Sequence, residues 1–210
     1  MQPHATTSRQ ISTCALALAC AWAGLLAGPP AMAQTAGTGA KAGASAGASI
    51  SCPPLLQHSF PRLQDDRPQP LCQYAGKVLL VVNTASFCGY TPQYEGLEAL
   101  HARYAARGLV VMGFPSNDFN QEAADAKQIA ELCFNTYGVK FPMFASSSVK
   151  GASANPLFGQ LTRATGKAPA WNFNKYLVGR DGVPVAHYGS STAPDSATLV
   201  AAIEKALAVR

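Results

Sequence analysis

The chain has 210 residues, of which 48% are hydrophobic, and a formal net charge of +5 at pH 7. This length allows one domain of ordinary size with additional segments, and the hydrophobic content is sufficient for a buried core. No run of Lys and Arg residues concentrates the positive charge, so the pattern is typical of a mildly basic, solvated surface and argues against a nucleic-acid-binding protein.

Residues 1–33 have the composition of a secretory signal peptide. They contain one basic residue, Arg9, no acidic residue, an apolar run from about Ile11 to Leu26, and an Ala-Met-Ala ending. A basic start, an apolar centre and an Ala-x-Ala ending are the parts of such a peptide. The apolar run is shorter than the roughly 20 residues of a membrane-spanning helix. We therefore expect cleavage and export, to the periplasm or outside the cell, with no stable membrane span afterwards; a permanent anchor is the alternative.

Residues 34–51 consist almost entirely of Ala, Gly, Ser and Thr. This composition cannot bury enough apolar surface to offset the entropy of ordering it, so it predicts a flexible linker. One folded domain is then predicted over residues 52–210. At its start, Cys52 and Cys72 flank a Pro-rich segment. In an exported protein we expect this pair to form a disulfide, with two free thiols as the alternative.

The stretch from Val78 to Pro92 is the most informative part of the chain. It begins with an unbroken aliphatic run, typical of a strand that is buried on both faces of a sheet. It ends in Thr91 and Pro92, a predicted helix cap and first-turn proline. Cys88 is thus expected between a central strand and a helix N-terminus, where unpaired N–H groups and the helix dipole favour a thiolate. A buried, unreactive cysteine is the alternative.

The rest of the domain alternates helices and strands. Cys133 shares the apolar face of a predicted helix with Ile129, so a small core residue is one interpretation of it, and Asp195 is predicted to cap the last helix. An Asp-Gly turn predicts a hairpin near the C-terminus. The predicted helices cover about 92–107, 126–137 and 156–165, and the predicted strands cover 109–114, 141–144, 176–178 and 183–188. This order predicts one α/β domain in which a sheet is layered against helices.

Three ordered motifs resemble those of the glutathione peroxidase family. They are Val-Asn-Thr-Ala-Ser-Phe-Cys-Gly-Tyr-Thr-Pro-Gln-Tyr at 82–94, Gly-Phe-Pro-Ser-Asn-Asp-Phe at 113–119 followed by Gln121-Glu122, and Trp-Asn-Phe-Asn-Lys-Tyr at 171–176. The similarity runs from about Lys77 to the C-terminus. It implies a thioredoxin-like α/β fold, with a central mixed sheet flanked by helices. It also implies a peroxidase that reduces hydrogen peroxide or organic hydroperoxides with a cysteine or selenocysteine nucleophile.

The same resemblance, carried over position by position, implies the site residues. Cys88 matches the peroxidatic residue, and Gln121, Trp171 and Asn172 match the polar partners that complete the family's catalytic tetrad. Amide and indole N–H groups suit this task because they can hold a thiolate and polarise a peroxide oxygen without neutralising the sulfur. Cys133 matches the resolving cysteine of the thioredoxin-dependent branch, which attacks the sulfenic acid formed on Cys88 and yields a disulfide.

The second motif departs from the family pattern. The loop from Phe119 to Gln121 is one residue shorter than the usual Phe-Gly-x-Gln, and Asn120 is the residue between them. Ser116 stands where many relatives carry a further cysteine. Cys133 is therefore the one candidate partner for Cys88 on this side of the domain.

A hydroperoxide substrate and a thiol reductant follow from the resemblance. We expect a thioredoxin-like protein rather than glutathione, because no cluster of basic residues near the motifs would hold the carboxylates of glutathione. The short span between Pro156 and Trp171 is, by the same resemblance, typical of a monomer. No cofactor is implied, and four scattered histidines give no indication of a metal site.

Two other functions remain open from the sequence. One is a thiol–disulfide oxidoreductase on the same fold, which is disfavoured because Thr91 occupies the second cysteine position of the Cys-x-x-Cys motif that such enzymes use. The other is a non-catalytic binding domain that has kept the fold, which is disfavoured because all four residues of the tetrad are present.

Overall fold

The computed structural model describes residues 51–209. The predicted signal peptide, residues 1–33, and residues 34–50 of the predicted linker lie outside the described residues. No helix within residues 51–209 is both long and apolar enough to cross a membrane.

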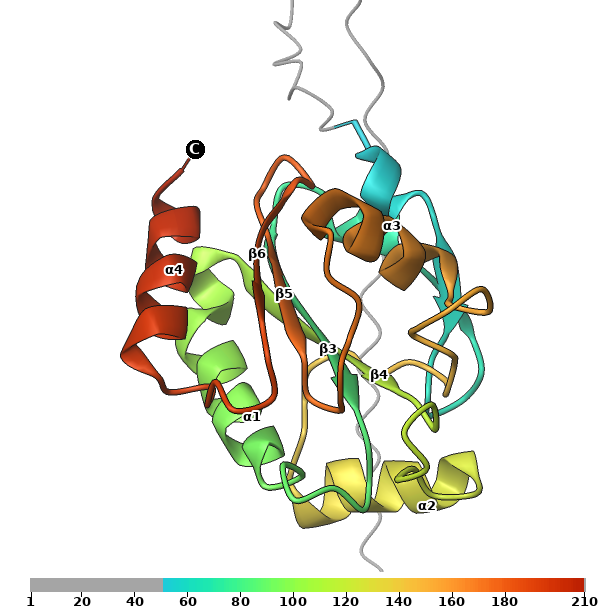
Figure 1. Cartoon of the computed structure of the whole chain (residues 1–210). Helices are drawn as coiled ribbons and strands as arrows, with labels where there is room; N and C mark the ends of the chain where they lie inside the picture. The colour runs from blue at the N-terminus through green and yellow to red at the C-terminus, as the bar shows by residue number, and fades with distance from the viewer. Residues whose placement is uncertain (1–50, 210) are drawn as a thin grey trace, which may run out of the picture. The chain divides into compact units, whose positions relative to one another are not determined.

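A four-stranded mixed sheet organises the domain, with the strand order β4-β3-β5-β6. The central strand β3 (Val78–Thr84) lies parallel to β4 (Leu109–Pro115) and antiparallel to β5 (Lys175–Val178). Strand β5 pairs antiparallel with the edge strand β6 (Pro184–Tyr188) through the predicted Asp-Gly turn. Figure 1 shows these strands side by side, and their pairing confirms the predicted mixed sheet.

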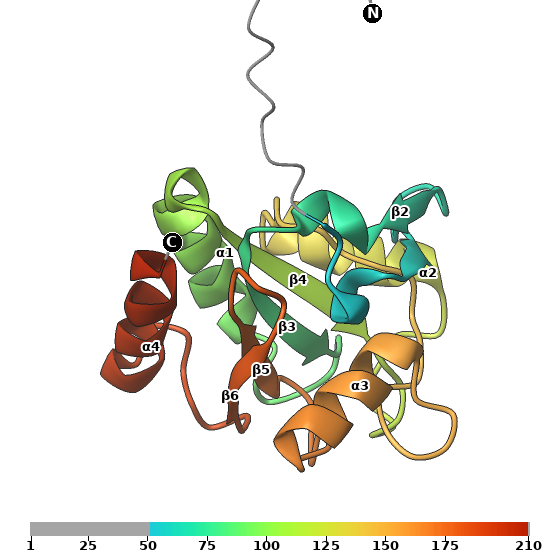
Figure 2. The same ribbon diagram turned by 90° about the horizontal axis from the view of Figure 1, so that it is seen from above.

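Helices cover both faces of this sheet, so β3 is buried along its whole length, as its aliphatic run predicts. The first, third and fifth side chains of β3 belong to the core that includes α1 and α4, and the second and fourth belong to the core that includes α3. Figure 2 shows α1 and α4 on one side of the sheet and α3 on the other. The bounds of these helices are Gln93–Tyr104 for α1, Pro156–Thr165 for α3 and Ala197–Ala208 for α4.

The predicted strand at 141–144 is not a strand. Two isolated bridges replace it, one between Met143 and Gly113 of β4 and one between Phe144 and Arg62. Pro142 has no N–H group to donate, which limits the ladder that this segment can form. Gly113 permits the approach, because a Cβ at this position would lie only 2.2 Å from Sδ of Met143.

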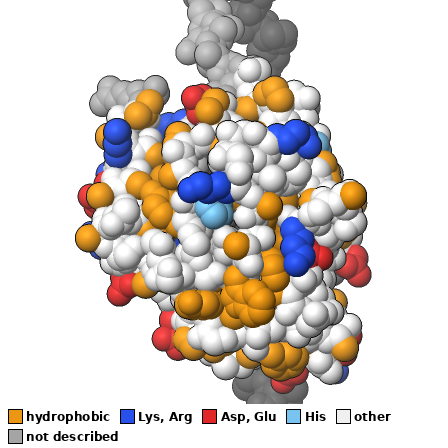
Figure 3. All heavy atoms as spheres, in the orientation of Figure 1, with side chains coloured by type: hydrophobic (Ala, Val, Ile, Leu, Met, Phe, Trp, Pro, Cys, Tyr) orange, Lys and Arg blue, Asp and Glu red, His pale blue; other side chains and the backbone are white. Residues whose placement is uncertain are grey.

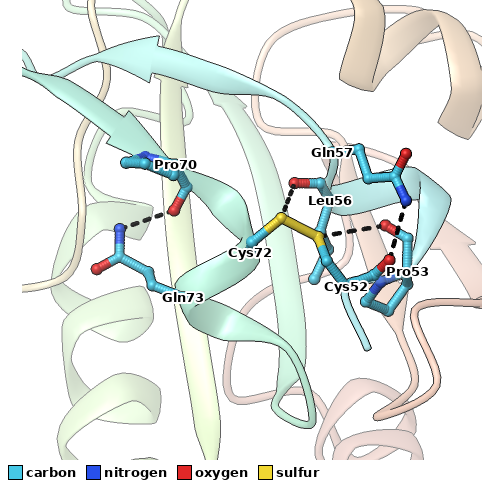
Figure 4. The surroundings of a disulfide bond; sticks show 7 residues. All are labelled: Cys52, Pro53, Leu56, Gln57, Pro70, Cys72 and Gln73. Carbon is cyan, nitrogen blue, oxygen red and sulfur yellow. Dashed lines mark hydrogen bonds between the residues drawn. A yellow bond between two sulfur atoms is a disulfide. The ribbon is translucent and has the colours of Figure 1, made fainter. Parts of the chain in front are cut away.

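The Pro-rich segment at the start of the domain is more ordered than its composition predicts. It contains a short antiparallel pair, β1 (Ser59–Pro61) and β2 (Pro68–Pro70), between the 3₁₀ turns η1 (Pro54–Leu56) and η2 (Leu71–Tyr74). A disulfide joins Cys52 to Cys72, whose Cα atoms lie 5.2 Å apart (Figure 4). The predicted pairing is therefore confirmed, and it closes this segment into a covalent loop.

The predicted helix at 126–137 is divided into two parts. The α-helix α2 (Ala126–Ala130) continues into η4 (Glu131–Thr136), a π-helical turn in which Tyr137 N donates to Leu132 O at 3.1 Å. Figure 1 shows both parts beyond the carboxyl end of β3. The predicted cap of the last helix is also corrected: the side chain of Ser196, not of Asp195, accepts a hydrogen bond from Leu199 N.

Candidate active site

Cys88 lies in the turn between β3 and α1, as predicted; the residue is 7% exposed and its thiol is free. The backbone N–H of Tyr90 points at its Sγ at 3.4 Å. Thr91 does not cap α1, which begins after Pro92. Instead, Oγ1 of Thr91 accepts from Cys88 N at 3.1 Å and donates to Ala85 O at 3.0 Å. Thr91 therefore fixes the backbone of the cysteine turn and presents the sulfur to an N–H donor.

The loop that carries Gln121 is attached to the cysteine turn. The backbone N–H of Phe87, the residue before Cys88, donates to Gln121 O at 2.8 Å. Asn120 has a φ of +56°, in the left-handed region that Asn tolerates better than most residues, and it turns the shortened loop. The side chain of Gln121 then accepts a hydrogen bond from Nδ2 of Asn172 at 3.0 Å. The structure thus brings together two of the predicted polar partners beside the turn that holds Cys88.

A pair of asparagines that the sequence reasoning missed holds the turn of Trp171 and Asn172. The side chains of Asn83 and Asn174 both donate to Trp171 O, at 3.0 and 2.9 Å. The two asparagines also bond to each other, because Asn174 N donates to Oδ1 of Asn83 at 3.1 Å. Phe173, at a φ of +59°, keeps the turn tight. Asn83 lies within the motif at 82–94 and Asn174 within the motif at 171–176. Their positions in these motifs were the signal in the sequence that could have identified them.

Exposed aromatic side chains lie on the turn of Trp171 and next to Cys88 in the sequence. Trp171 is 42% exposed and its ring lies 5.3 Å from that of Phe119, over which Nζ of Lys150 sits at 4.2 Å. Phe87 is 68% exposed. In Figure 3 hydrophobic side chains gather on the face that includes the carboxyl end of β3.

Cys133 lies on η4 and is fully buried, in the same hydrophobic core as Cys88. Its thiol is also free, so the two cysteines are not joined in this state. Burial raises the pKa of Cys133 to about 12. A cleft of about 360 Å³ is lined by residues of the cysteine turn and of η4, and its lining includes Phe87, Ala123 and Leu132.

The described residues offer little for a metal ion. Within residues 51–209, no three His, Cys, Asp or Glu side chains are grouped so that they could hold one.

Comparisons with known proteins identify the family of this chain. Residues 58–162 match a family model described as glutathione peroxidase. The hydroperoxy fatty acid reductase gpx1 of Synechocystis sp. is 47% identical over 154 residues, which cover 68% of this chain and 90% of that protein. A crystal structure of Trgpx in its apo form matches with a TM-score of 0.59 at 32% identity, over 73% of this chain and 95% of that one.

A more distant structure bears on the fold alone. A thioredoxin-family thiol:disulfide interchange protein from Chlorobium tepidum matches with a TM-score of 0.56 at 15% identity, over 76% of this chain and 99% of that one. The predicted thioredoxin-like fold is thereby confirmed. On the family model and the relatives together, the chain belongs to the glutathione peroxidase family.

Proposed function

We propose that this protein is a thiol peroxidase that reduces hydrogen peroxide or organic hydroperoxides through Cys88. The thiolate attacks one peroxide oxygen, an S–O bond forms as the O–O bond breaks, and the departing oxygen leaves as water or an alcohol once it is protonated. Cys88 is oxidised to a sulfenic acid while the peroxide is reduced. The observation that carries this proposal is the Asn172–Gln121 hydrogen bond beside the turn of Cys88.

The polar partners have separate tasks in this proposal. Asn172 occupies the oxygen of the Gln121 amide, which leaves the amide N–H groups of Gln121 to donate to the sulfur or to the departing oxygen. Oδ1 of Asn172 is buried without a partner and can accept a hydrogen bond from the peroxide O–H. The indole N–H of Trp171 is a second donor, in addition to the amide of Gln121. None of these groups can transfer a proton to the thiolate.

Cys133 is proposed to resolve the sulfenic acid. Its sulfur attacks Cys88, a disulfide forms and water leaves. A disulfide requires Cα atoms about 5.5 Å apart, so a fully buried thiol on η4 has to become accessible first. The π-helical turn supports this step, because such turns interrupt regular helical hydrogen bonding and are frequent at functional sites. Equal hydrogen exchange across residues 126–137 in the reduced and oxidised protein would contradict this opening.

A thioredoxin-like protein is the proposed reductant of the resulting disulfide, since dithiol proteins reduce disulfides by exchange. The name of the Synechocystis relative supports a hydroperoxide substrate. A thiol–disulfide oxidoreductase is the weaker alternative, because the position of its second cysteine is held by Thr91, whose hydroxyl is committed to the cysteine turn.

Export is proposed as well. The composition of residues 1–33 supports a secretory signal peptide, and the Cys52–Cys72 disulfide supports an oxidising compartment such as the periplasm. We also propose that the protein acts as a monomer, which the short span between Pro156 and Trp171 supports by resemblance to the family.

The decisive experiment follows peroxide consumption with thioredoxin or with glutathione in the wild type, Cys88→Ser and Cys133→Ser. We expect no turnover by Cys88→Ser with either reductant. Cys133→Ser should stop after one turnover with thioredoxin, with a sulfenic acid on Cys88 that dimedone traps. Full turnover by Cys88→Ser would overturn the proposed function, and full thioredoxin-driven turnover by Cys133→Ser would remove Cys133 from it.

A further inference from the structure

A buried lysine at the start of β5 has only neutral acceptors. Lys175 is fully buried, and its Nζ donates to Oε1 of Gln93 at 2.6 Å and to Phe173 O at 2.7 Å. Within residues 51–209, no carboxylate forms an ion pair with it. Burial lowers its pKa to about 8, so the ammonium still carries its charge at neutral pH. A buried charge without an ion-pair partner is costly, and packing alone does not account for it.

One acceptor of Lys175 belongs to a residue in an unfavourable backbone conformation. Phe173 has a φ of +59° and is fully buried. A residue with a large side chain adopts this left-handed region only where surrounding contacts hold it there. Two backbone groups of Phe173 are held, since its N–H donates to Asn83 O at 2.6 Å and its carbonyl accepts from Lys175. Lys175 therefore helps to keep this backbone in its left-handed conformation.

The conformation of Phe173 decides where the two residues before it lie. Trp171 carries the indole donor of the proposed site, and Asn172 donates to Oε1 of Gln121 at 3.0 Å. A rotation about φ of Phe173 would swing both residues relative to β5, because they lie on the N-terminal side of that bond. A displacement of about 1 Å in a reacting group can slow a reaction by about 100-fold. The geometry of the site thus depends on a peptide group that Lys175 holds.

The other acceptor of Lys175 connects the same turn to α1. Gln93 is the first residue of α1, the helix that follows the turn of Cys88. Its Oε1 accepts from Lys175, and its Nε2 donates to Ser190 O at 2.7 Å. The hydroxyl of Ser190 donates in turn to Asn172 O at 2.5 Å. A continuous chain of contacts therefore runs from the ammonium through the Gln93 amide and Ser190 to the backbone of Asn172.

We propose that Lys175 is a positioning residue for the reduction of peroxide, an inference that rests on the function proposed above. Its ammonium holds the carbonyl of Phe173 and so maintains the left-handed conformation. Through Gln93 it also attaches the turn of Trp171 and Asn172 to α1. A charged donor suits this task, because hydrogen bonds from an ionised group are roughly twice as strong as those between neutral groups. Lys175 acts through this turn and is assigned no contact with the sulfur or the peroxide.

Lys175→Met tests this assignment, because it keeps an apolar side chain of similar length and removes the donor. Sulfenic acid formation on Cys88 of the full chain is followed by stopped flow with hydrogen peroxide at neutral pH. The thiolate fraction is measured by ultraviolet absorbance, and the rate is expressed per thiolate. We expect this rate to fall at least about tenfold in Lys175→Met. Lys205→Met, at an exposed position on α4, is the matched control and should react like the wild type.

A second background separates positioning from a general structural role. In Trp171→Phe/Asn172→Ala, both groups that the lysine is proposed to position are absent. Adding Lys175→Met to this protein should change the rate per thiolate by less than about twofold, because effects that act through the same groups are not additive. An equal tenfold loss in both backgrounds would overturn the proposal. A loss in the wild-type background that is explained entirely by a smaller thiolate fraction would overturn it as well.

The fluorescence of Trp171 reports the turn directly. The chain has two tryptophans, so Trp22→Phe leaves Trp171 as the single emitter. In this background we expect Lys175→Met to shift the emission to longer wavelength and to increase quenching by acrylamide, because the indole becomes more exposed. Emission and quenching that match those of the parent protein would show that the turn does not depend on the lysine, and would overturn the proposal.

Gln93→Leu keeps the proposal testable if Lys175→Met does not fold. It interrupts the chain of contacts to Asn172 while it leaves Lys175 in place, so we expect the rate per thiolate to fall at least about threefold. A wild-type rate in Gln93→Leu would overturn the proposal. Failure of the wild type itself to form a sulfenic acid on Cys88 would overturn the proposed function, and this inference with it. A reactive wild type with an equally reactive Lys175→Met overturns only the role of Lys175.

Discussion

Nδ2 of Asn172 donates a hydrogen bond to Oε1 of Gln121 at 3.0 Å, across 51 residues of sequence. The bond joins the loop after β4 to the turn before β5 and decides which way each amide faces. Since the oxygen of Gln121 is occupied, its two N–H groups are the ones that remain for sulfur and peroxide. Two neutral amides thus complete a donor site that the positive end of α1 alone would not provide.

Replacement of Gln121 by Glu should remove this donor while it keeps the shape of the side chain. We expect the second-order rate of Cys88 oxidation by hydrogen peroxide to fall by about 100-fold, which is typical of the loss of one donor to a developing negative charge. Stopped-flow measurement of sulfenic acid formation checks this. Gln128→Glu, an exposed position on α2, is the control for added charge. A Gln121→Glu rate within threefold of the wild type would exclude a role for the amide.

Removal of the side chain of Asn174 should displace the turn of Trp171. Asn174 donates to Trp171 O and to Oγ of Ser190, whose hydroxyl in turn donates to Asn172 O. Asn174→Ala leaves buried groups without partners, so we expect a loss of about 1–3 kcal/mol in the free energy of unfolding.

The same variant should also oxidise more slowly, because this turn carries the indole donor of Trp171 and also Asn172, which orients the amide of Gln121. Urea unfolding and peroxide kinetics give the two readouts. Asn135→Ala, on the exposed side of η4, should change neither. Loss of stability with unchanged kinetics would show that the turn does not depend on Asn174 for its active geometry.

Lys175 predicts a distinctive pH dependence of stability. It is fully buried, its Nζ donates to Oε1 of Gln93 and to Phe173 O, and burial lowers its pKa from 10.5 to about 8. As the pH rises, the folded protein loses this proton first, so the unfolded state binds more protons between about pH 8 and pH 10.5. Stability therefore rises through this window, by up to about 3 kcal/mol from this group.

Urea unfolding of the wild type and Lys175→Met, measured from about pH 7 to pH 10.5, checks this dependence. The difference between the two proteins isolates Lys175, because Cys133 and the buried tyrosines titrate in both. The free energy of unfolding of Lys175→Met minus that of the wild type should be largest at neutral pH and should decrease as the pH rises. A difference that does not change with pH would contradict the lowered pKa of Lys175.

Reduction of the Cys52–Cys72 disulfide should lower stability and leave the chemistry intact. The bridge closes a loop over a sequence separation of 20 residues, which corresponds to about 3 kcal/mol in the chain-entropy model. We expect Cys52→Ser/Cys72→Ser to unfold at lower urea concentration. Its rate of Cys88 oxidation should match that of the wild type, because these residues lie outside the site. A slower oxidation would indicate that the N-terminal segment supports the cysteine turn.

Patterns of neighbouring residues in the sequence were enough to predict the central strand, the end of the helix that follows it and the position of Cys88. The aliphatic run of β3 predicted a strand buried on both faces, because an all-apolar strand is stable only under helices. The helical segment that begins with α1 ends at Gly108, whose φ of +99° would strain a residue with a side chain. The position of Cys88 after β3 followed from the same stretch.

Tertiary structure decided what depends on partners distant in sequence. The strand predicted at 141–144 is missing because Pro142 has no N–H group for a ladder, so only isolated bridges form there. Thr91 is of a residue type that often caps helices and it precedes Pro92, yet its hydroxyl forms its hydrogen bonds within the cysteine turn. The contact of Asn172 with Gln121 arises only when separate loops meet at the carboxyl end of β3. Hydrogen bonds are directional and short, so no pattern along the chain specifies them until the fold brings donor and acceptor together.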